Sequence, residues 1–201
     1  MKLFVSPGAC SLAPHIALQE IGADFEAVKV DLGTRKTEAG DDFIAVNATG
    51  KVPALMLDNG EILTENPAIL LYIADQGSQA RLVPQEGSLE RYQLLSRLSF
   101  LSSEFHKAFV PLFTPGSSEE AKAAATVAVT IHLATLEREL TGKEHYVGEA
   151  YSVADIYLFV MLGWPGYVGI DMAPYPALGT YAGKIAQRPA VGAALKAEGL
   201  A

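Results

Sequence analysis

The single cysteine of the chain, Cys10, lies with Ser11 between a short strand-like run that ends at Val5 and a helical pattern that begins at Ser11. The N-terminus of a helix presents unpaired backbone N–H groups and a partial positive charge, which together stabilise an anion. This placement predicts a lowered pKa and a larger thiolate population for Cys10, with the Ser11 hydroxyl one residue away. The alternative interpretation is a small, buried hydrophobic cysteine.

A second candidate segment, Lys51-Val52-Pro53-Ala54, comes directly before a predicted strand. Proline is tolerated at the first residue of a strand. If the bond before Pro53 is cis, the backbone groups of Val52 face outward and form an edge for an extended peptide. An ordinary trans turn is the alternative, since most such bonds are trans.

A third segment, Thr64-Glu65-Asn66-Pro67, opens a predicted helix. A carboxylate in the first turn favours the helix dipole, and this structural role is one explanation for Glu65. The functional alternative is that Glu65 binds the ammonium group of a ligand, while the backbone N–H and side chain of Asn66 bind its carboxylate.

One stripe of the helix predicted from Ser88 carries small or uncharged polar side chains. At about 100° per residue, this stripe contains Ser96, Ser99, Ser103 and His106. The charged residues of the helix fall on a different stripe, which is the expected solvated face. The uncharged stripe therefore suits a cleft or a contact between helices, although a lone histidine is also compatible with a structural role.

The elements that position these residues change in type along the chain. The first 80 residues follow the order β-α-β-α-β-β-α, which predicts an α+β domain with a mixed four-stranded sheet. Its strands are expected at residues 2–5, 25–30, 53–57 and 61–63, and its helices at 11–21, 41–46 and 65–75. From residue 88 the pattern is helical, with helices expected at 88–110, 118–140, 152–163, 176–187 and 189–197. We expect two domains, at residues 1–80 and 87–201.

Composition limits the classes of function. The 15 Lys and Arg residues against 23 Asp and Glu residues give a net charge of −8, which disfavours a nucleic-acid partner. A single cysteine excludes an intrachain disulfide framework and a multi-cysteine zinc site, and no metal is expected. No targeting or membrane-spanning segment is expected, because the longest uncharged run is short and interrupted by glycine and proline. These features predict a reduced, cytoplasmic protein without a membrane partner.

Taken together, the motifs resemble those of the bacterial beta-class glutathione transferases over essentially the whole chain. The matching segments are Met1-Lys2-Leu3-Phe4, Pro7-Gly8-Ala9-Cys10-Ser11, Val52-Pro53-Ala54-Leu55, Leu63-Thr64-Glu65, His106-Lys107, the capping box Ser152-Val153-Ala154-Asp155, Arg188-Pro189 and Ala197-Glu198-Gly199-Leu200. Each segment is weak evidence alone, and their joint order and spacing carry the resemblance.

The resemblance implies a thioredoxin-like N-terminal domain that binds glutathione, an all-helical domain that binds a hydrophobic electrophile, and a homodimer. In the family, the cysteine at position 10 faces the glutathione sulfur and can form a mixed disulfide with it. The residue at Val52, before a cis-proline at Pro53, pairs with the cysteinyl unit, and Glu65 and Asn66 match the pair that holds the γ-glutamyl group.

The remaining site residues follow from the same resemblance. His106 matches a residue near the sulfur, and Lys107 accompanies it in the glutathione site. Ser99 and Ser103 match positions that the neighbouring subunit contributes. Arg35 replaces a usual lysine near the glycyl end, so the cation is retained with a different geometry. Asn66 stands where serine is common, and Ser99 where asparagine is common.

The leading hypothesis is conjugation of the glutathione thiol to hydrophobic electrophiles, with Cys10, His106 and Ser11 as catalytic residues. The electrophile pocket is expected to involve apolar and aromatic residues, namely Phe109, Val110, Phe113, Trp164 and Tyr167. One alternative is a glutaredoxin-like thiol–disulfide oxidoreductase, or a glutathione-dependent peroxidase, that uses Cys10. Another is a non-catalytic protein that binds hydrophobic ligands.

Overall fold

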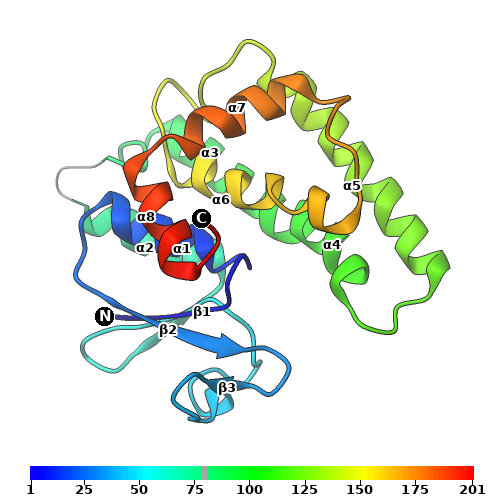
Figure 1. Cartoon of the computed structure of the whole chain (residues 1–201). Coiled ribbons are helices and arrows are strands. Elements are labelled where there is room, and N and C mark those ends of the chain that lie inside the picture. Colours follow the sequence, from blue (N-terminus) through cyan, green and yellow to red (C-terminus); the bar gives the residue numbers. More distant parts are fainter. Residues whose placement is uncertain (78–80) are drawn as a thin grey trace. The chain divides into compact units, whose positions relative to one another are not determined.

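The computed structural model describes residues 1–77 and 81–201, and these form two compact units. The N-terminal unit comprises Met1–Val83 and Gln187–Ala201, and the helical unit comprises Pro84–Ala186. The predicted domain end at residue 80 lies outside the described residues. The last 15 residues, which the sequence placed with the helical domain, form one compact unit with the N-terminal residues, and their helix packs against the first helix of the chain (Figure 1).

The N-terminal unit is built on a mixed sheet in the order β3-β2-β1-β4-β5. The strands are β1 (Lys2–Val5), β2 (Glu26–Asp31), β3 (Lys36–Thr37), β4 (Ala54–Met56) and β5 (Ile62–Thr64). Strands β1 and β2 are parallel and the other pairs are antiparallel. The four predicted strands are present. The fifth, β3, has only two residues, which are too few to give an alternating pattern.

Alternation along β1 divides the apolar side chains between the two faces of the sheet. Phe4 packs against Phe43 of the 3₁₀-helix η1 (Phe43–Ala45), with ring centroids 5.4 Å apart. Val30, Val52 and Ala54 join this cluster. Because the cluster includes Val52, the apolar core fixes the loop that precedes β4.

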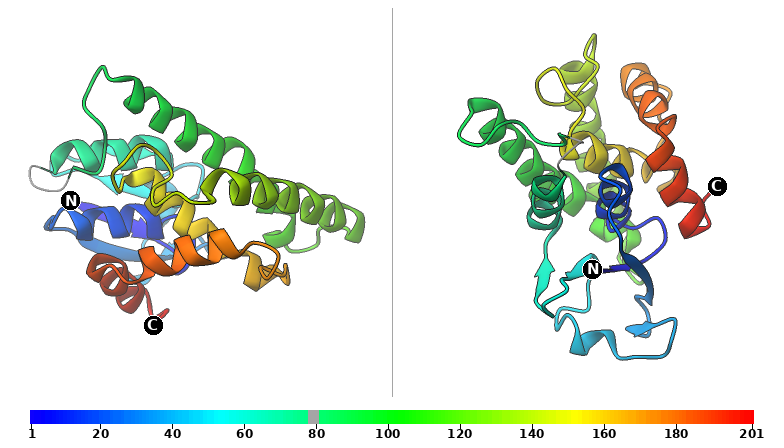
Figure 2. Two further views of the ribbon diagram at one scale, coloured as in Figure 1. Left: turned by 90° about the horizontal axis from the view of Figure 1, so that it is seen from above. Right: turned by 90° about the vertical axis from the view of Figure 1, so that its left-hand side faces the viewer.

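Three helices complete the N-terminal unit: α1 (Leu12–Glu20), α2 (Asn66–Gln76) and α8 (Pro189–Glu198). Helix α1 contacts both α2 and α8, and α8 lies beside α1 in Figures 1 and 2. Arg188 donates to Glu20 with an Nη2–Oε2 distance of 2.9 Å, which pairs the start of α8 with the end of α1. The last helix therefore belongs to the unit that contains Cys10.

The helical unit contains five α-helices among its described residues, with a π-helical turn between the first two. They are α3 (Leu89–Phe100), η2 (Leu101–Phe105), α4 (His106–Phe113), α5 (Glu119–Leu140), α6 (Val153–Leu162) and α7 (Pro176–Ala186), with a short 3₁₀-helix, η3 (Pro165–Val168), after α6. Helix α6 is buried along most of its length and contacts α3 and α7 (Figure 2). No helix among the described residues is long and apolar enough to span a membrane.

The predicted capping box begins α6. The backbone N–H and the hydroxyl of Ser152 both donate to Asp155, at 2.8 and 2.7 Å. The other carboxylate oxygen of Asp155 accepts from Tyr146 N at 2.7 Å and from Tyr181 Oη at 2.6 Å. The fully buried carboxylate of Asp155 therefore connects the start of α6 to α7 and to the loop before α6. Burial, together with the negative charge of Asp155, raises the pKa of Tyr181.

Candidate functional site

Cys10 lies immediately before α1 and is buried. Its thiol donates to the backbone oxygen of Val52, with an Sγ–O distance of 3.3 Å. The Val52–Pro53 peptide bond is cis, as the family resemblance implies; the residues alone had left the trans form open. The side-chain Nδ2 of Asn66 donates to the backbone oxygen of Cys10 at 3.1 Å. Three segments that the sequence singled out separately therefore meet at one cysteine.

Burial decides the protonation state of Cys10. It raises the pKa of the thiol to about 12, because the thiolate would lose its hydration, and the negative charge of Glu65 adds to this increase. The backbone N–H of Cys10 and the side chain of Asn66 lower the pKa, but by less than burial raises it. The sequence prediction of a lowered pKa is therefore wrong for this chain, since it counted the helix N-terminus and not the burial.

The loop that carries Cys10 is closed by its own polar groups. Ser6 N donates to the hydroxyl of Ser11 at 3.0 Å, and that hydroxyl donates back to Ser6 O at 3.3 Å. The Ser11 side chain is fully buried. In this structure the hydroxyl of Ser11 therefore holds the shape of the loop.

The C-terminal helix provides a second support for the same loop. Gly8 has a φ of 72°, and its N–H donates to Glu198 Oε2 at 2.9 Å. The other oxygen of Glu198 lies 2.8 Å from His15 Nδ1 in α1, and both side chains are buried. Sequence reasoning missed Glu198 in this role, because spacing along the chain gives no signal for a contact across 183 residues.

Glu65 and Arg35 are the non-glycine residues with positive φ, at 67° and 59°, in the part of the chain that the structure describes. Glu65 is exposed and directly precedes α2. A backbone in this sparsely populated region costs about 1–3 kcal/mol and is frequent at ligand-binding positions. The guanidinium of Arg35 donates to the backbone oxygen of Gly50, which places Arg35 beside the segment that leads to Val52.

The amide oxygen of Asn66 is also unusual. It is buried and has no hydrogen-bond partner among the residues of the described ranges. Its amide nitrogen donates to the backbone oxygen of Cys10, so the oxygen is an unused buried acceptor on the residue that follows Glu65.

The remaining predicted site residues belong to the helical unit. His106 is half-buried, and its Nδ1 lies 3.1 Å from the hydroxyl of Tyr157. Its ring packs edge-on against Trp164, with centroids 4.9 Å apart. Lys107, Ser99 and Ser103 are exposed. The structure therefore surrounds His106 with aromatic groups and leaves the other three side chains at the surface of this unit.

The predicted electrophile pocket is partly assembled within the helical unit. Trp164 packs edge-on against Phe109 and Phe113, with centroids 5.4 and 5.7 Å apart. Val110 and Tyr167 are exposed, with 47% and 75% of the residue surface accessible. Trp164 thus joins His106 to an aromatic cluster, and sequence reasoning missed the other neighbour of His106, Tyr157.

The predicted single helix at 88–110 is interrupted at η2. The N–H of His106 donates to the oxygen of Leu101, five residues earlier, as in a π-helix. A π-helical turn contains one more residue than an α-helical turn, so residues after it are rotated relative to a projection at 100° per residue. The predicted stripe of Ser96, Ser99, Ser103 and His106 therefore does not continue in straight register to His106.

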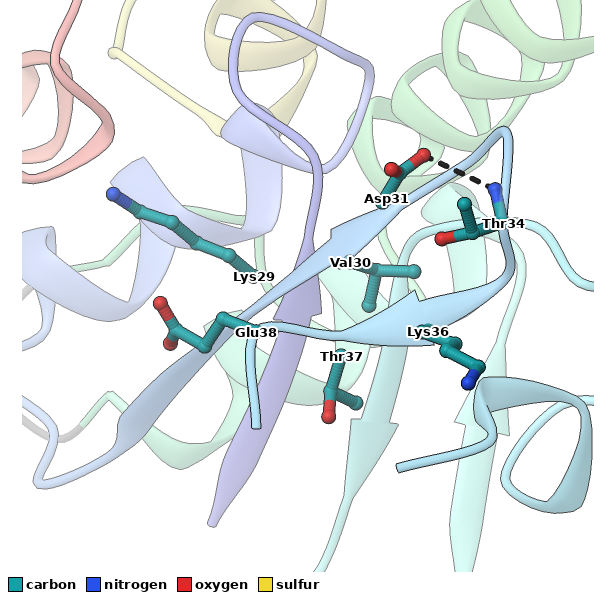
Figure 3. Close-up of a pocket in the computed structure, with 7 residues that line it drawn as sticks. All are labelled: Lys29, Val30, Asp31, Thr34, Lys36, Thr37 and Glu38. Carbon is teal, nitrogen blue, oxygen red and sulfur yellow. Dashed lines mark hydrogen bonds between the residues drawn. The ribbon is translucent and has the colours of Figure 1, made fainter. Parts of the chain in front are cut away.

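A pocket of about 400 Å³ lies elsewhere in the N-terminal unit, at the β2–β3 hairpin (Figure 3). Its lining residues are Lys29, Val30, Asp31, Thr34, Lys36, Thr37 and Glu38. Asp31 accepts from the backbone N–H of Thr34 at 3.2 Å and thereby shapes the turn. None of the residues predicted for the functional site lines this pocket.

Comparison with known proteins identifies the family. Residues 1–75 match the glutathione S-transferase N-terminal domain, and residues 100–189 match its C-terminal domain. The chain is 41% identical over 200 residues to the glutathione S-transferase GstA of Escherichia coli O157:H7, with full coverage of both.

Two solved structures are more similar. A bacterial beta-class glutathione S-transferase from Sphingomonas chungbukensis is 74% identical, with a TM-score of 0.98 and full coverage of both chains. A sphingomonad glutathione S-transferase solved in complex with glutathione is 78% identical, with a TM-score of 0.97 and the same coverage. The resemblance first recognised in the Cys10, Val52-Pro53 and Glu65 segments is thus confirmed over the whole length, and the chain belongs to the beta class of the glutathione S-transferase family.

Proposed function

We propose that the protein conjugates the thiol of glutathione to hydrophobic electrophiles, with glutathione bound beside Cys10. The observation that carries this proposal is the meeting of Val52, Asn66 and α1 at Cys10, through hydrogen bonds of 3.3 and 3.1 Å. The complex of the 78% identical sphingomonad enzyme with glutathione supports it.

Each part of glutathione has a matching group in the N-terminal unit. The backbone of Val52, at the cis-proline Pro53, pairs with the cysteinyl unit. Glu65 accepts from the γ-glutamyl ammonium, and the N-terminus of α2, with the backbone N–H of Asn66, binds its carboxylate. Arg35 provides the cation for the glycyl carboxylate.

The helical unit supplies the other residues of this proposal. Lys107 provides a second cation for glutathione, and His106 lies near its sulfur. Ser99 and Ser103 contact the ligand from the neighbouring subunit of a homodimer, which agrees with their exposure on the single chain. The cluster of Phe109, Phe113 and Trp164 contacts the electrophile.

The raised pKa of Cys10 defines its part in the reaction. With a pKa of about 12, only about one molecule in 10⁵ carries a Cys10 thiolate at pH 7. We therefore assign Cys10 as an S–H donor that turns from Val52 O to the glutathione sulfur when glutathione binds, and that stabilises the glutathione thiolate, which is the nucleophile. Ser11 maintains the loop that places this donor.

Substitution of His106 tests the conjugation mechanism. His106→Ala should lower kcat/KM with a chloronitroaromatic acceptor by about 10²-fold, the lower end of the effect of removing a positioned hydrogen-bond donor. His145→Ala, which removes another histidine from the helical unit, should leave the rate unchanged. An unaltered rate in His106→Ala would remove His106 from the catalytic set.

Glutathione binding can be measured separately by calorimetry on the reduced protein. Binding should be weaker in Glu65→Gln than in the unchanged protein, because one acceptor for the ammonium loses its charge. Absence of any heat with millimolar glutathione would contradict the proposed site itself.

Thiol–disulfide exchange is the second candidate, because Cys10 lies at the N-terminus of α1. In that reaction the Cys10 thiolate attacks glutathione disulfide, forms a mixed disulfide and releases one glutathione thiolate. Mass spectrometry after incubation with glutathione disulfide should show an adduct that Cys10→Ala abolishes. A high rate of adduct formation at pH 7 would favour this function over conjugation, and binding of apolar dyes with neither activity would indicate a non-catalytic protein.

A further inference from the structure

Tyr157 is a buried tyrosine whose hydroxyl lies against the candidate catalytic histidine. It belongs to α6, is 1% exposed, and its Oη lies 3.1 Å from His106 Nδ1. A buried hydroxyl without a hydrogen bond costs about 1–3 kcal/mol, so this contact stabilises the fold as well as orienting the histidine. Both residues lie in the helical unit.

The His106 ring is held in place by more than one contact. The Tyr157 ring meets it edge-on with centroids 6.5 Å apart, at 82°, and Trp164 meets it at 4.9 Å and 61°. The backbone of His106 is fixed by the π-type bond from its N–H to Leu101 O. These contacts fix the direction of the imidazole, so that the hydrogen bond at Nδ1 determines which chemistry Nε2 can perform.

The direction of that hydrogen bond follows from the two groups. A neutral imidazole has one N–H and one nitrogen that accepts, whereas a tyrosine hydroxyl can do either. The unprotonated nitrogen of imidazole is a stronger acceptor than a phenol oxygen, whose lone pair is delocalised into its ring. The favoured arrangement is therefore Tyr157 O–H donating to His106 Nδ1, which leaves the ring proton on Nε2.

The geometry points to Tyr157 as a positioning residue that holds His106 in the tautomer with its proton on Nε2, so that His106 serves the reaction as a donor. This inference rests on the proposed conjugation function. In that reaction glutathione releases its thiol proton to solvent, the thiolate sulfur forms the new S–C bond, and the departing group leaves with the electron pair of the broken bond. Nε2–H donates a hydrogen bond to the negative charge on the glutathione sulfur or on that departing group. No proton leaves His106, so the histidine ends the turnover in its starting state.

The tautomer can be measured without any activity assay. The full-length protein labelled with ¹⁵N-histidine should show, for His106, an Nδ1 signal of the unprotonated type and an Nε2 signal of the protonated type. The chain has four histidines, and loss of one set of signals in His106→Gln identifies the correct set. A protonated-type Nδ1 signal for His106 in the unchanged protein would overturn the proposal.

Tyr157→Phe removes the hydroxyl and keeps the ring. We expect its His106 signals to shift toward a mixture of the two tautomers, and kcat for conjugation to fall about tenfold with KM for glutathione changed less than twofold. The matched control is Tyr146→Phe, since that buried hydroxyl has no hydrogen-bond partner within the described part of the chain. Tyr146→Phe should leave both the His106 signals and kcat for conjugation unchanged. Unchanged His106 signals in Tyr157→Phe would contradict the role of its hydroxyl.

A second pair of variants tests which ring nitrogen of His106 carries the donated proton. The side-chain nitrogen of glutamine can replace Nε2–H, whereas that of asparagine lies closer to the position of Nδ1. His106→Gln should therefore retain at least about threefold more conjugation activity than His106→Asn, and the reverse order would overturn the proposal. If His106→Ala conjugates normally, the catalytic role inferred here for His106 is overturned. If instead the unchanged protein fails to conjugate while the tautomer is as expected, the proposed function fails and the Tyr157 contact stands.

Discussion

The two units present their functional side chains in opposite ways. In the N-terminal unit, Cys10, Ser11 and Asn66 are buried, and each is hydrogen-bonded to backbone of the same unit. In the helical unit, Ser103 and Lys107 are exposed. Apart from the exposed Glu65, the residues proposed for the N-terminal site are therefore mostly part of the folded core, whereas the helical unit displays Ser99, Ser103 and Lys107 on its surface.

Because of this difference, substitutions at the buried site residues of the N-terminal unit should change both the free energy of unfolding and the function. Substitutions at the exposed residues of the helical unit should change the function alone. A change at a buried site residue removes a hydrogen bond that folding also uses. A change at an exposed one is expected to alter ligand contacts with little effect on the free energy of unfolding.

The largest effect is expected at Glu198. Glu198→Ala removes the acceptor of Gly8 N–H and the partner of His15, both of which are buried or partly buried. Loss of one member of a buried pair costs about 3–5 kcal/mol, so the free energy of unfolding in urea should fall by about 3 kcal/mol. Glu144→Gln is the control, because its ion pair with Lys184 is exposed on both sides, at 55% for Lys184 and 76% for Glu144, and the loss should be about 1 kcal/mol or less. Equal losses of unfolding free energy in the two variants would contradict the expected difference between the buried pair and the more exposed one.

The next effect depends on pH. The pKa of Cys10 is raised from 9.0 to about 12 by folding, so above pH 9 the unfolded chain loses a proton that the folded chain keeps. Stability from this group is full below pH 9 and falls as pH rises toward 12, by about 1.4 kcal/mol per pH unit. Between pH 8 and 10.5, the unchanged protein should lose about 2 kcal/mol more than Cys10→Ser. Parallel pH curves for the two proteins would show that Cys10 is not desolvated.

A smaller loss is expected at Asn66. Asn66→Ala removes the 3.1 Å hydrogen bond to Cys10 O, although that oxygen also accepts from Ala13 N at 3.2 Å. The variant also removes a buried, unpartnered amide oxygen, which offsets part of the loss. The free energy of unfolding should fall by about 1 kcal/mol. Denaturant titration measures this free energy. A loss as large as that of Glu198→Ala would contradict the expected partial compensation.

The smallest effect is expected at Lys107. Its side chain is exposed, so Lys107→Ala should change the free energy of unfolding by less than about 0.5 kcal/mol, or Tm by at most about 2 °C. KM for glutathione should nevertheless rise severalfold, because a cation for the ligand is lost. A large fall in Tm together with an unchanged KM would show that Lys107 serves the stability of the helical unit and not ligand binding.

Local features of the sequence predicted much of this molecule. The β1–α1 junction at Cys10, the helix that begins near Glu65 and the box from Ser152 to Asp155 depend on neighbouring residues, and all are present. Pattern and spacing sufficed there, because capping and alternation act over a few residues.

The features that sequence reasoning missed depend on distant residues or on subtle backbone changes. The raised pKa of Cys10 depends on the residues that bury it. The packing of α8 against α1 includes the contact between Glu198 and His15, which are 183 residues apart. The π-helical turn before His106 adds a residue to a helix without changing its apolar pattern. Tyr157 lies 51 residues from His106, so its contact has no local signal.

The contact between Glu198 and His15 also sets an order of events during synthesis. Residue 198 leaves the ribosome 183 residues after residue 15, which at about 5–20 residues per second is a delay of about 10–40 s. The helical unit is one continuous stretch, Pro84–Ala186, and all of its residues are made within that interval. The second unit in the sequence can thus fold while the nascent first unit still lacks its last helix, and a chaperone that shields exposed apolar surface would act on the first unit.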